Sequence, residues 1–86
     1  MLIQAKALTA SAAVTAAAWY VLSVRSGLSN TEVIAYHGAA ATAGNEVLSD
    51  NSDGGDFAPI PGIYCSDGLY LKVDGGTGIV RYYLAS

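Results

Sequence analysis

The chain is short of cysteine and of positive charge. Its 86 residues include a single cysteine, Cys65, so an intramolecular disulfide is excluded. The clustered cysteine and histidine ligands of a structural zinc site are also missing. One domain of this size buries roughly 60 to 65% of the surface of its unfolded chain and is therefore only marginally stable by itself. Self-association is the usual remaining source of stability.

Basic residues are too few and too scattered to form a polyanion-binding surface. Four of them, Lys6, Arg25, Lys72 and Arg81, stand against seven acidic residues, which gives a net charge of -3. Contact with several phosphates requires a basic stripe, so we expect neither nucleic acid nor an anionic membrane surface as a direct partner. By contrast, 52% of the residues are hydrophobic and 13% are charged. This composition favours a protomer that buries an apolar face against copies of itself or a partner.

Residues 7–24 form an uncharged stretch between Lys6 and Arg25. Its length is sufficient for a membrane-spanning helix, but serines and threonines interrupt it and alanine contributes little to lipid partitioning. Lys6, an apolar stretch and the three alanines before Trp19 also follow the order of a secretory signal peptide. We expect neither a membrane span nor a cleaved leader.

The period of this stretch predicts extended chain. Every even position from 8 to 24 is apolar, whereas the serines and threonines fall at odd positions. A helical stripe from Leu8 would pass through Ser11 and Thr15 and would mix polar with apolar side chains. Because a single strand of this length is unusual, we expect a bend near residues 12–13 or 16–18 to divide it in two.

The C-terminal third has the clearest strand signals. Two runs alternate between apolar residues and residues expected to face away from the core, and the predicted core face comprises Leu69, Leu71, Val73, Val80, Tyr82 and Leu84. The glycine-rich loop 74–78 between the runs can adopt positive φ, so we expect it to form a hairpin.

The sequence as a whole predicts an all-β fold. The expected strands lie near residues 2–11, 14–25, 33–37, 45–49, 57–64, 69–73 and 79–84. This spacing is typical of a compact antiparallel β-sandwich or jelly roll of about seven or eight short strands. We expect residues 1–86 to form a single domain, with residues 1–8 as a candidate N-terminal arm.

Asp50, Asp53 and Asp56 form one acidic cluster, which invites comparison with calcium-binding loops. Aligned by its glycines, the loop places Ser49 and Ile60 where an EF-hand requires two carboxylates. Aspartate, asparagine and glycine are common in solvated turns. We therefore expect no cofactor, and retain the three aspartates only as candidates for a weak cation site.

Nucleophilic catalysis would require Cys65 or a serine beside His37. These residues belong to separate strands or turns, and nothing in their spacing brings them together. We expect His37 to be a hydrogen-bonded structural residue at the end of a strand. Cys65 is expected to be a small buried hydrophobe before the turn at residues 66–68. The sequence therefore predicts no enzymatic activity.

Several segments resemble, in order, a group of very short structural proteins of tailed-phage virions. The segments span most of the chain and are Lys6-Ala-Leu-Thr-Ala-Ser-Ala-Ala-Val14, Val33-Ile-Ala-Tyr36, Pro61-Gly-Ile-Tyr64, Asp67-Gly-Leu-Tyr70 and Gly76-Thr-Gly-Ile-Val-Arg-Tyr-Tyr83. The chain differs from the group at His37-Gly38 and in its alanine run. The resemblance implies a structural component of a phage particle, a class that includes capsid decoration (cement), head-fibre and tail-accessory proteins.

Composition and resemblance together lead us to expect a capsid decoration protein, assembled in the host cytoplasm and located on the virion surface. It would form a homotrimer and bridge capsomers by binding the major capsid protein or another virion protein. The candidate interface residues are Leu2, Ile3 and Leu8 in the arm, together with Trp19 and Tyr83. For Trp19 and Tyr83 the alternative is that they cover the core. The alternative function is a head-fibre or tail-accessory module that binds a host glycan on its aromatic residues.

Overall fold

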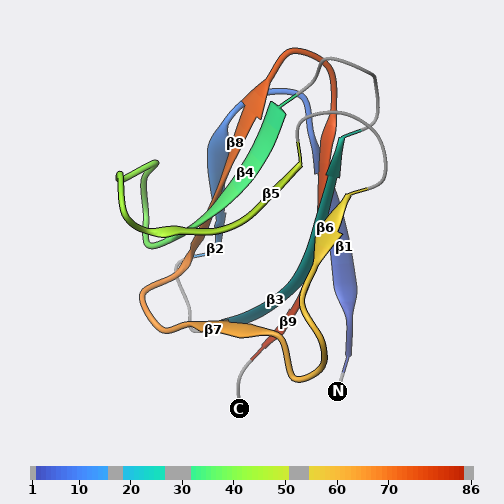
Figure 1. Cartoon of the computed structure of the whole chain (residues 1–86), viewed down its shortest axis with the longest axis vertical. Coiled ribbons are helices and arrows are strands. Elements are labelled where there is room, and N and C mark those ends of the chain that lie inside the picture. Colours follow the sequence, from blue (N-terminus) through green and yellow to red (C-terminus); the bar gives the residue numbers. More distant parts are fainter. Residues whose placement is uncertain (1, 16–18, 27–31, 51–54, 85–86) are drawn as a thin grey trace.

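A computed structural model describes residues 2–15, 19–26, 32–50 and 55–84 of the chain (Figure 1). These residues form nine strands: β1 (Gln4–Leu8), β2 (Ala12–Thr15), β3 (Trp19–Ser26), β4 (Glu32–His37), β5 (Glu46–Asp50), β6 (Asp56–Phe57), β7 (Ile63–Cys65), β8 (Leu69–Asp74) and β9 (Gly78–Leu84). The described residues contain no helix that is long and apolar enough to cross a membrane.

The strands form two antiparallel sheets, which pack into the predicted β-sandwich. Sheet A has the order β1-β9-β3-β6, with β7 also paired to β3, and sheet B has the order β2-β8-β4-β5. The apolar faces of the two sheets enclose one core. The core consists of Val21, Val24, Val33, Ala35, Leu48, Cys65, Leu69, Leu71, Val73, Val80 and Tyr82.

The alternation predicted for the last two strands is confirmed with one exception. Leu69, Leu71 and Val73 of β8 face the core, and so do Val80 and Tyr82 of β9. The exception, Leu84, pairs with Trp19 near the end of β9 and is half exposed. Alternation identified the side of each strand that faces the core. It did not show that the last residue on that side, Leu84, extends beyond the core.

The loop between β8 and β9 does not form the expected hairpin. Because β8 belongs to sheet B and β9 to sheet A, the loop is an arch that joins the two sheets at the top of Figure 1. Gly75 and Gly76 in this arch have φ of 77° and 78°, as a tight reversal requires. The connection from β1 to β2 changes sheets at the same end of the molecule.

Two small residues make close contacts at this end of the sandwich. A Cβ on Gly78 would lie 2.8 Å from Cγ2 of Val73 and 3.0 Å from Cγ1 of Val33, so the sheets approach here because position 78 has no side chain. Ser11, between β1 and β2, accepts a hydrogen bond from the N–H of Val73 at 2.9 Å. Its hydroxyl also lies within donating distance of the Val73 carbonyl, at 3.3 Å.

The strand boundaries differ from the prediction in two places. Residues 2–25, expected as two strands, contain β1, β2 and β3, because the chain changes sheets twice. Residues 57–64, expected as one strand, are divided between β6 and β7. Pro59 and Pro61 lie in this interval and have no N–H to contribute to a ladder. The described residues therefore form nine strands instead of seven or eight.

Candidate functional site

The interface residues predicted in the N-terminal segment lie at one edge of sheet A. β1 pairs with β9 along all five of its residues, so residues 4–8 complete the domain's own sheet and do not extend as an arm. Leu2 and Ile3, which precede β1, are 76% and 48% exposed. Leu8, by contrast, packs against the core. The accessible apolar part of the predicted arm is therefore Leu2 and Ile3.

Trp19 occupies the position of a core-covering residue. It opens β3, is partly buried and packs against the core. Its ring meets that of Tyr82 edge-on, with ring centroids 4.8 Å apart and an interplanar angle of 72°. The indole Nε1 is shielded from solvent and has no hydrogen-bond partner among the described residues. These contacts match the alternative in which Trp19 covers the core.

Tyr83 belongs to a row of three tyrosines on the outer face of sheet A, the face turned away from sheet B. Tyr20 stacks on Tyr83 and packs at a tilt against Tyr64, with ring centroids 5.1 Å apart in both pairs. We call Tyr20, Tyr64 and Tyr83 the tyrosine row. Tyr83 is 8% exposed, whereas Tyr64 is 51% exposed. Tyr64 is thus the most accessible ring of the row.

The environment of the Tyr83 hydroxyl affects its ionisation. The hydroxyl donates a hydrogen bond to the carbonyl of Pro61, in the loop between β6 and β7. Removal from water, followed by the influence of Tyr20, raises the pKa of Tyr83 above its ordinary value. The sequence could not show that this loop would contact Tyr83 on the outer face of sheet A.

The acidic cluster contributes hydrogen-bond acceptors to the fold. Asp50 is buried at the end of β5, where its Oδ2 accepts the N–H of Ser26 at 2.8 Å. Oδ2 of Asp56 accepts the N–H of Ser49 at 3.1 Å. Asp53, the third candidate, lies outside the described residues. Among the residues in the described ranges, no three acidic, cysteine or histidine side chains gather in a way that could hold a metal ion.

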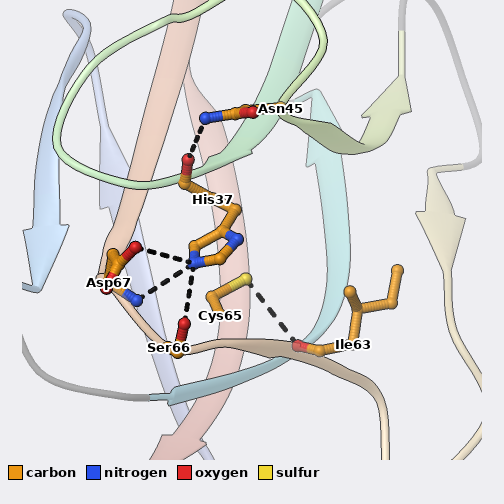
Figure 2. Close-up of polar contacts among 6 residues, drawn as sticks. All are labelled: His37, Asn45, Ile63, Cys65, Ser66 and Asp67. Atoms are coloured by element: carbon orange, nitrogen blue, oxygen red, sulfur yellow. Dashed lines mark hydrogen bonds and ion pairs between the residues drawn. The ribbon is translucent and has the colours of Figure 1, made fainter.

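His37 lies at the end of β4 against the turn between β7 and β8 (Figure 2). Its Nε2 accepts the N–H of Asp67 at 3.0 Å and lies 3.3 Å from Oγ of Ser66. The Asp67 carboxylate is 3.8 Å from the same nitrogen. The predicted hydrogen-bonded histidine is therefore confirmed. The expectation that no serine would lie beside it is wrong, because strand pairing between β4 and β8 brings the turn to this position.

The geometry of this cluster differs from that of a nucleophilic triad. A triad histidine contacts the nucleophile through one ring nitrogen and the acid through the other. Here all the contacts of Ser66 and Asp67 with His37 converge on Nε2, as Figure 2 shows. Since Nε2 accepts a backbone N–H, the neutral ring carries its proton on Nδ1. The arrangement fastens the turn at residues 66–68 to β4.

Cys65 has the properties that the sequence predicts. The residue is fully buried at the end of β7, and its Sγ lies 3.8 Å from the carbonyl of Ile63 (Figure 2). Burial raises the pKa of the thiol above its ordinary value, which disfavours the reactive thiolate. Cys65 is therefore a component of the core.

The sequence analysis missed a groove of about 230 Å³ on the outer face of sheet A. Strands β3 and β9 and residues 55–57 enclose it, and the lining residues are Ser23, Val24, Arg25, Gly55, Phe57, Ile79 and Arg81. Arg25 and Arg81 are both exposed, next to the buried Val24 and Val80 on the same strands. Their guanidinium groups therefore belong to the outer face, on the side opposite to the core.

Comparison with known proteins identifies no relative, because no family model, no curated protein and no solved structure matches the chain. The geometry of the described residues offers three candidate surfaces: the β1 edge with Leu2 and Ile3, the tyrosine row, and the groove with Arg25 and Arg81.

Proposed function

We propose that this chain is a non-enzymatic structural protein of a tailed phage, a capsid decoration protein that forms a homotrimer and bridges capsomers. It would be made in the host cytoplasm and would remain on the outer surface of the virion. The resemblance of its strand and turn segments to short virion proteins supports this proposal. Its partners would be copies of itself and the major capsid protein or another virion protein.

The observation that carries the proposal is the exposed apolar extension of an edge strand. β1 stands at the end of sheet A, and within the described residues it pairs with β9 alone. The unpaired N–H and C=O groups of an edge strand can pair with another chain. Leu2 and Ile3 continue from this edge with 76% and 48% exposure. These two side chains would be buried against the partner, next to the new backbone hydrogen bonds.

Lys6 would make this edge selective. It lies in the middle of β1, and a lysine on an edge strand disfavours pairing with unrelated strands. A partner strand with a carboxylate opposite Lys6 would overcome this barrier. The edge therefore fits a specific partner better than general aggregation.

Stabilisation of a shell by such a protein would follow from mass action. A protein that binds the assembled lattice more tightly than the loose subunits shifts the equilibrium toward the lattice. A trimer that contacts neighbouring capsomers would gain further from multivalency, because the second and third contacts become intramolecular.

Light scattering over a dilution series from high micromolar to nanomolar provides the first test, together with co-sedimentation with capsids of the phage whose genome carries this sequence. We expect a stable trimer that co-sediments with the capsids. The double substitution Leu2→Ser/Ile3→Ser should weaken capsid binding by roughly tenfold or more, because truncation of an interface hot spot costs more than about 1 kcal/mol. Deletion of residues 1–8 is unsuitable, since it would strip β1 from β9.

The matched control is Phe57→Ser, which removes an apolar side chain of 72% exposure from β6, at the opposite end of sheet A from β1. It should leave capsid binding unchanged. A monomer at every concentration that also fails to co-sediment would overturn the proposal. Equal losses in the control and in the double variant would contradict the assignment of the β1 edge.

The tyrosine row favours a second candidate, a glycan-binding module of a head fibre or tail accessory. Aromatic faces are common platforms for sugar rings, and Tyr64 offers one at 51% exposure. On a glycan array, Tyr64→Ala should abolish any binding, whereas Tyr70→Ala on sheet B should preserve it. Array binding without capsid binding would replace the first proposal with this one.

A further inference from the structure

The groove on sheet A brings together two features, a pair of cationic side chains and an exposed aromatic ring. Arg25 and Arg81 line this groove together with Ile79 and the exposed Phe57. In a chain with four basic and seven acidic residues, half of the basic residues therefore line one groove. Neither arginine forms an ion pair within the part of the chain that the structure describes.

Strand register places the two arginines close enough to share one ligand. Arg25 lies opposite Ile79, and Arg81 lies opposite Ser23, so the two arginines are diagonal neighbours on β3 and β9. Diagonal neighbours on one face of a sheet are roughly 7 to 8 Å apart, within reach of long side chains. Two guanidinium groups that share one groove repel each other, and an oxyanion bound between them would remove the repulsion.

The rest of the groove fits an apolar body attached to that oxyanion. Phe57 pairs with Ser23 on the other side of β3 and is 72% exposed, so its ring is accessible to a ligand in the groove. Gly55 closes the groove by running against β3, where a Cβ would come within 2.9 Å of the Val24 carbonyl. An exposed aromatic ring beside two arginines is suited to a ligand with a flat apolar group that carries a negative charge at one end.

The volume limits the size of the ligand. Sites for drug-sized molecules usually measure roughly 300 to 1,000 Å³, whereas this groove measures about 230 Å³. A single aromatic ring with one oxyanion is therefore the scale that fits. We propose that the groove formed by Arg25, Arg81, Phe57 and Ile79 binds a small oxyanion carried on a flat apolar group. This site is independent of the β1 edge and of the function proposed for it.

The oxyanion belongs to a carboxylate or a phosphoryl group, since the arginine fork matches both. Titration of the full-length ¹⁵N-labelled protein with benzoate and with phenyl phosphate, followed by amide chemical shifts, tests the site and separates the two sources. We expect saturable shifts confined to residues 23–25, 55–57 and 79–81. Tighter binding of benzoate would assign the site to carboxylates, and tighter binding of phenyl phosphate would assign it to phosphoryl groups.

Five variants define the roles of the side chains. Arg25→Gln and Arg81→Gln should each weaken binding by roughly tenfold, as expected for the loss of one charge-assisted hydrogen bond, and the double variant should abolish it. Both arginines are exposed, so these substitutions should not disturb folding. Phe57→Ser should weaken the binding of benzoate and of phenyl phosphate while leaving the arginine contacts intact. Lys72→Gln is the matched control, because it removes a cation from β8 in sheet B, and it should bind as tightly as the wild type.

Neutral benzamide, which keeps the shape of benzoate without its charge, should bind at least tenfold more weakly. The proposal is overturned by shifts that do not saturate or that map outside the groove. It is also overturned if the double arginine variant binds as well as Lys72→Gln, or if benzamide binds as well as benzoate.

Discussion

Gly78 of β9 lies against Val33 of β4 across the interior of the sandwich. The β8–β9 arch and the β1–β2 connection join the two sheets at this end. A Cβ at position 78 would come within 3.0 Å of Cγ1 of Val33 and within 2.8 Å of Cγ2 of Val73. These distances are shorter than ordinary carbon contacts, so an added methyl group requires the sheets to move apart or the valines to shift.

Gly78→Ala should therefore destabilise the protein by about 1 to 3 kcal/mol, the usual effect of overpacking a core. Urea unfolding followed by tryptophan fluorescence would measure the change. In a Val33→Ala background the cost of Gly78→Ala should fall, because the smaller residue makes room for the methyl group. An unchanged cost in that background would show that the contact with Val33 is not the cause.

His37 should contribute to stability through the turn that it fastens. His37→Ala removes the acceptor of the Asp67 N–H and should lower the free energy of unfolding by about 1 kcal/mol. Ser66→Ala removes only the longer contact at 3.3 Å and should have a smaller effect. Amide hydrogen exchange provides a local readout, since the amide of Asp67 should lose protection in His37→Ala alone. Equal protection in both variants would contradict the role assigned to the imidazole.

Alkaline pH should destabilise the protein through Tyr83. The pKa of Tyr83 in the folded state is raised above the ordinary 10.0, so the folded state holds this proton more tightly than the unfolded chain. The resulting stability is fully present below pH 10 and is lost as pH rises through the higher folded pKa. Tyr83→Phe should flatten this part of the curve of unfolding free energy against pH. Tyr64→Phe, at the exposed end of the row, is the control and should retain the slope.

Cys65 should be protected from thiol reagents in the native protein. The side chain is fully buried and burial raises the pKa of the thiol, so both access and thiolate fraction are low. Labelling with iodoacetamide should be slow in buffer, and its rate should rise across the urea unfolding transition. Rapid labelling under native conditions would show that β7 detaches from β3 without global unfolding.

The sequence predicted what each strand looks like but not which strand it pairs with. Alternation at Leu69, Leu71 and Val73 reports a core-facing side, and this information is local. Whether loop 74–78 is a hairpin or an arch depends on which sheet contains β9, and alternation within a strand does not report this. Similarly, the period of residues 8–24 indicated extended chain correctly, and the length of the stretch predicted a division near residues 12–13 or 16–18. Residues 12–13 lie within β2, and residues 16–18 lie outside the described residues, between β2 and β3. The pattern did not show that the chain changes sheets both before and after β2.

The candidate sites follow the same division. The character of Cys65 and His37 could be predicted because neighbouring residues determine it. The groove could not, because Arg25 and Arg81 are far apart in sequence and only the pairing of β3 with β9 brings them together. The meeting of His37 with Ser66 likewise depends on the pairing of β4 with β8. Alternation could have placed Arg25 and Arg81 on one outer face only if the register between β3 and β9 had been known.

The order in which the strands pair determines how the chain can fold during synthesis. β1 pairs with β9, and β2 pairs with β8. The first two strands to be synthesised therefore have no partner until the last two strands have been made. Contacts this distant in sequence slow folding. Neither sheet can be completed until β8 and β9 have been synthesised, and we expect the domain to fold in one late cooperative step. Until then, the apolar strands at both ends of the chain depend on dilution or chaperones to avoid pairing with other copies.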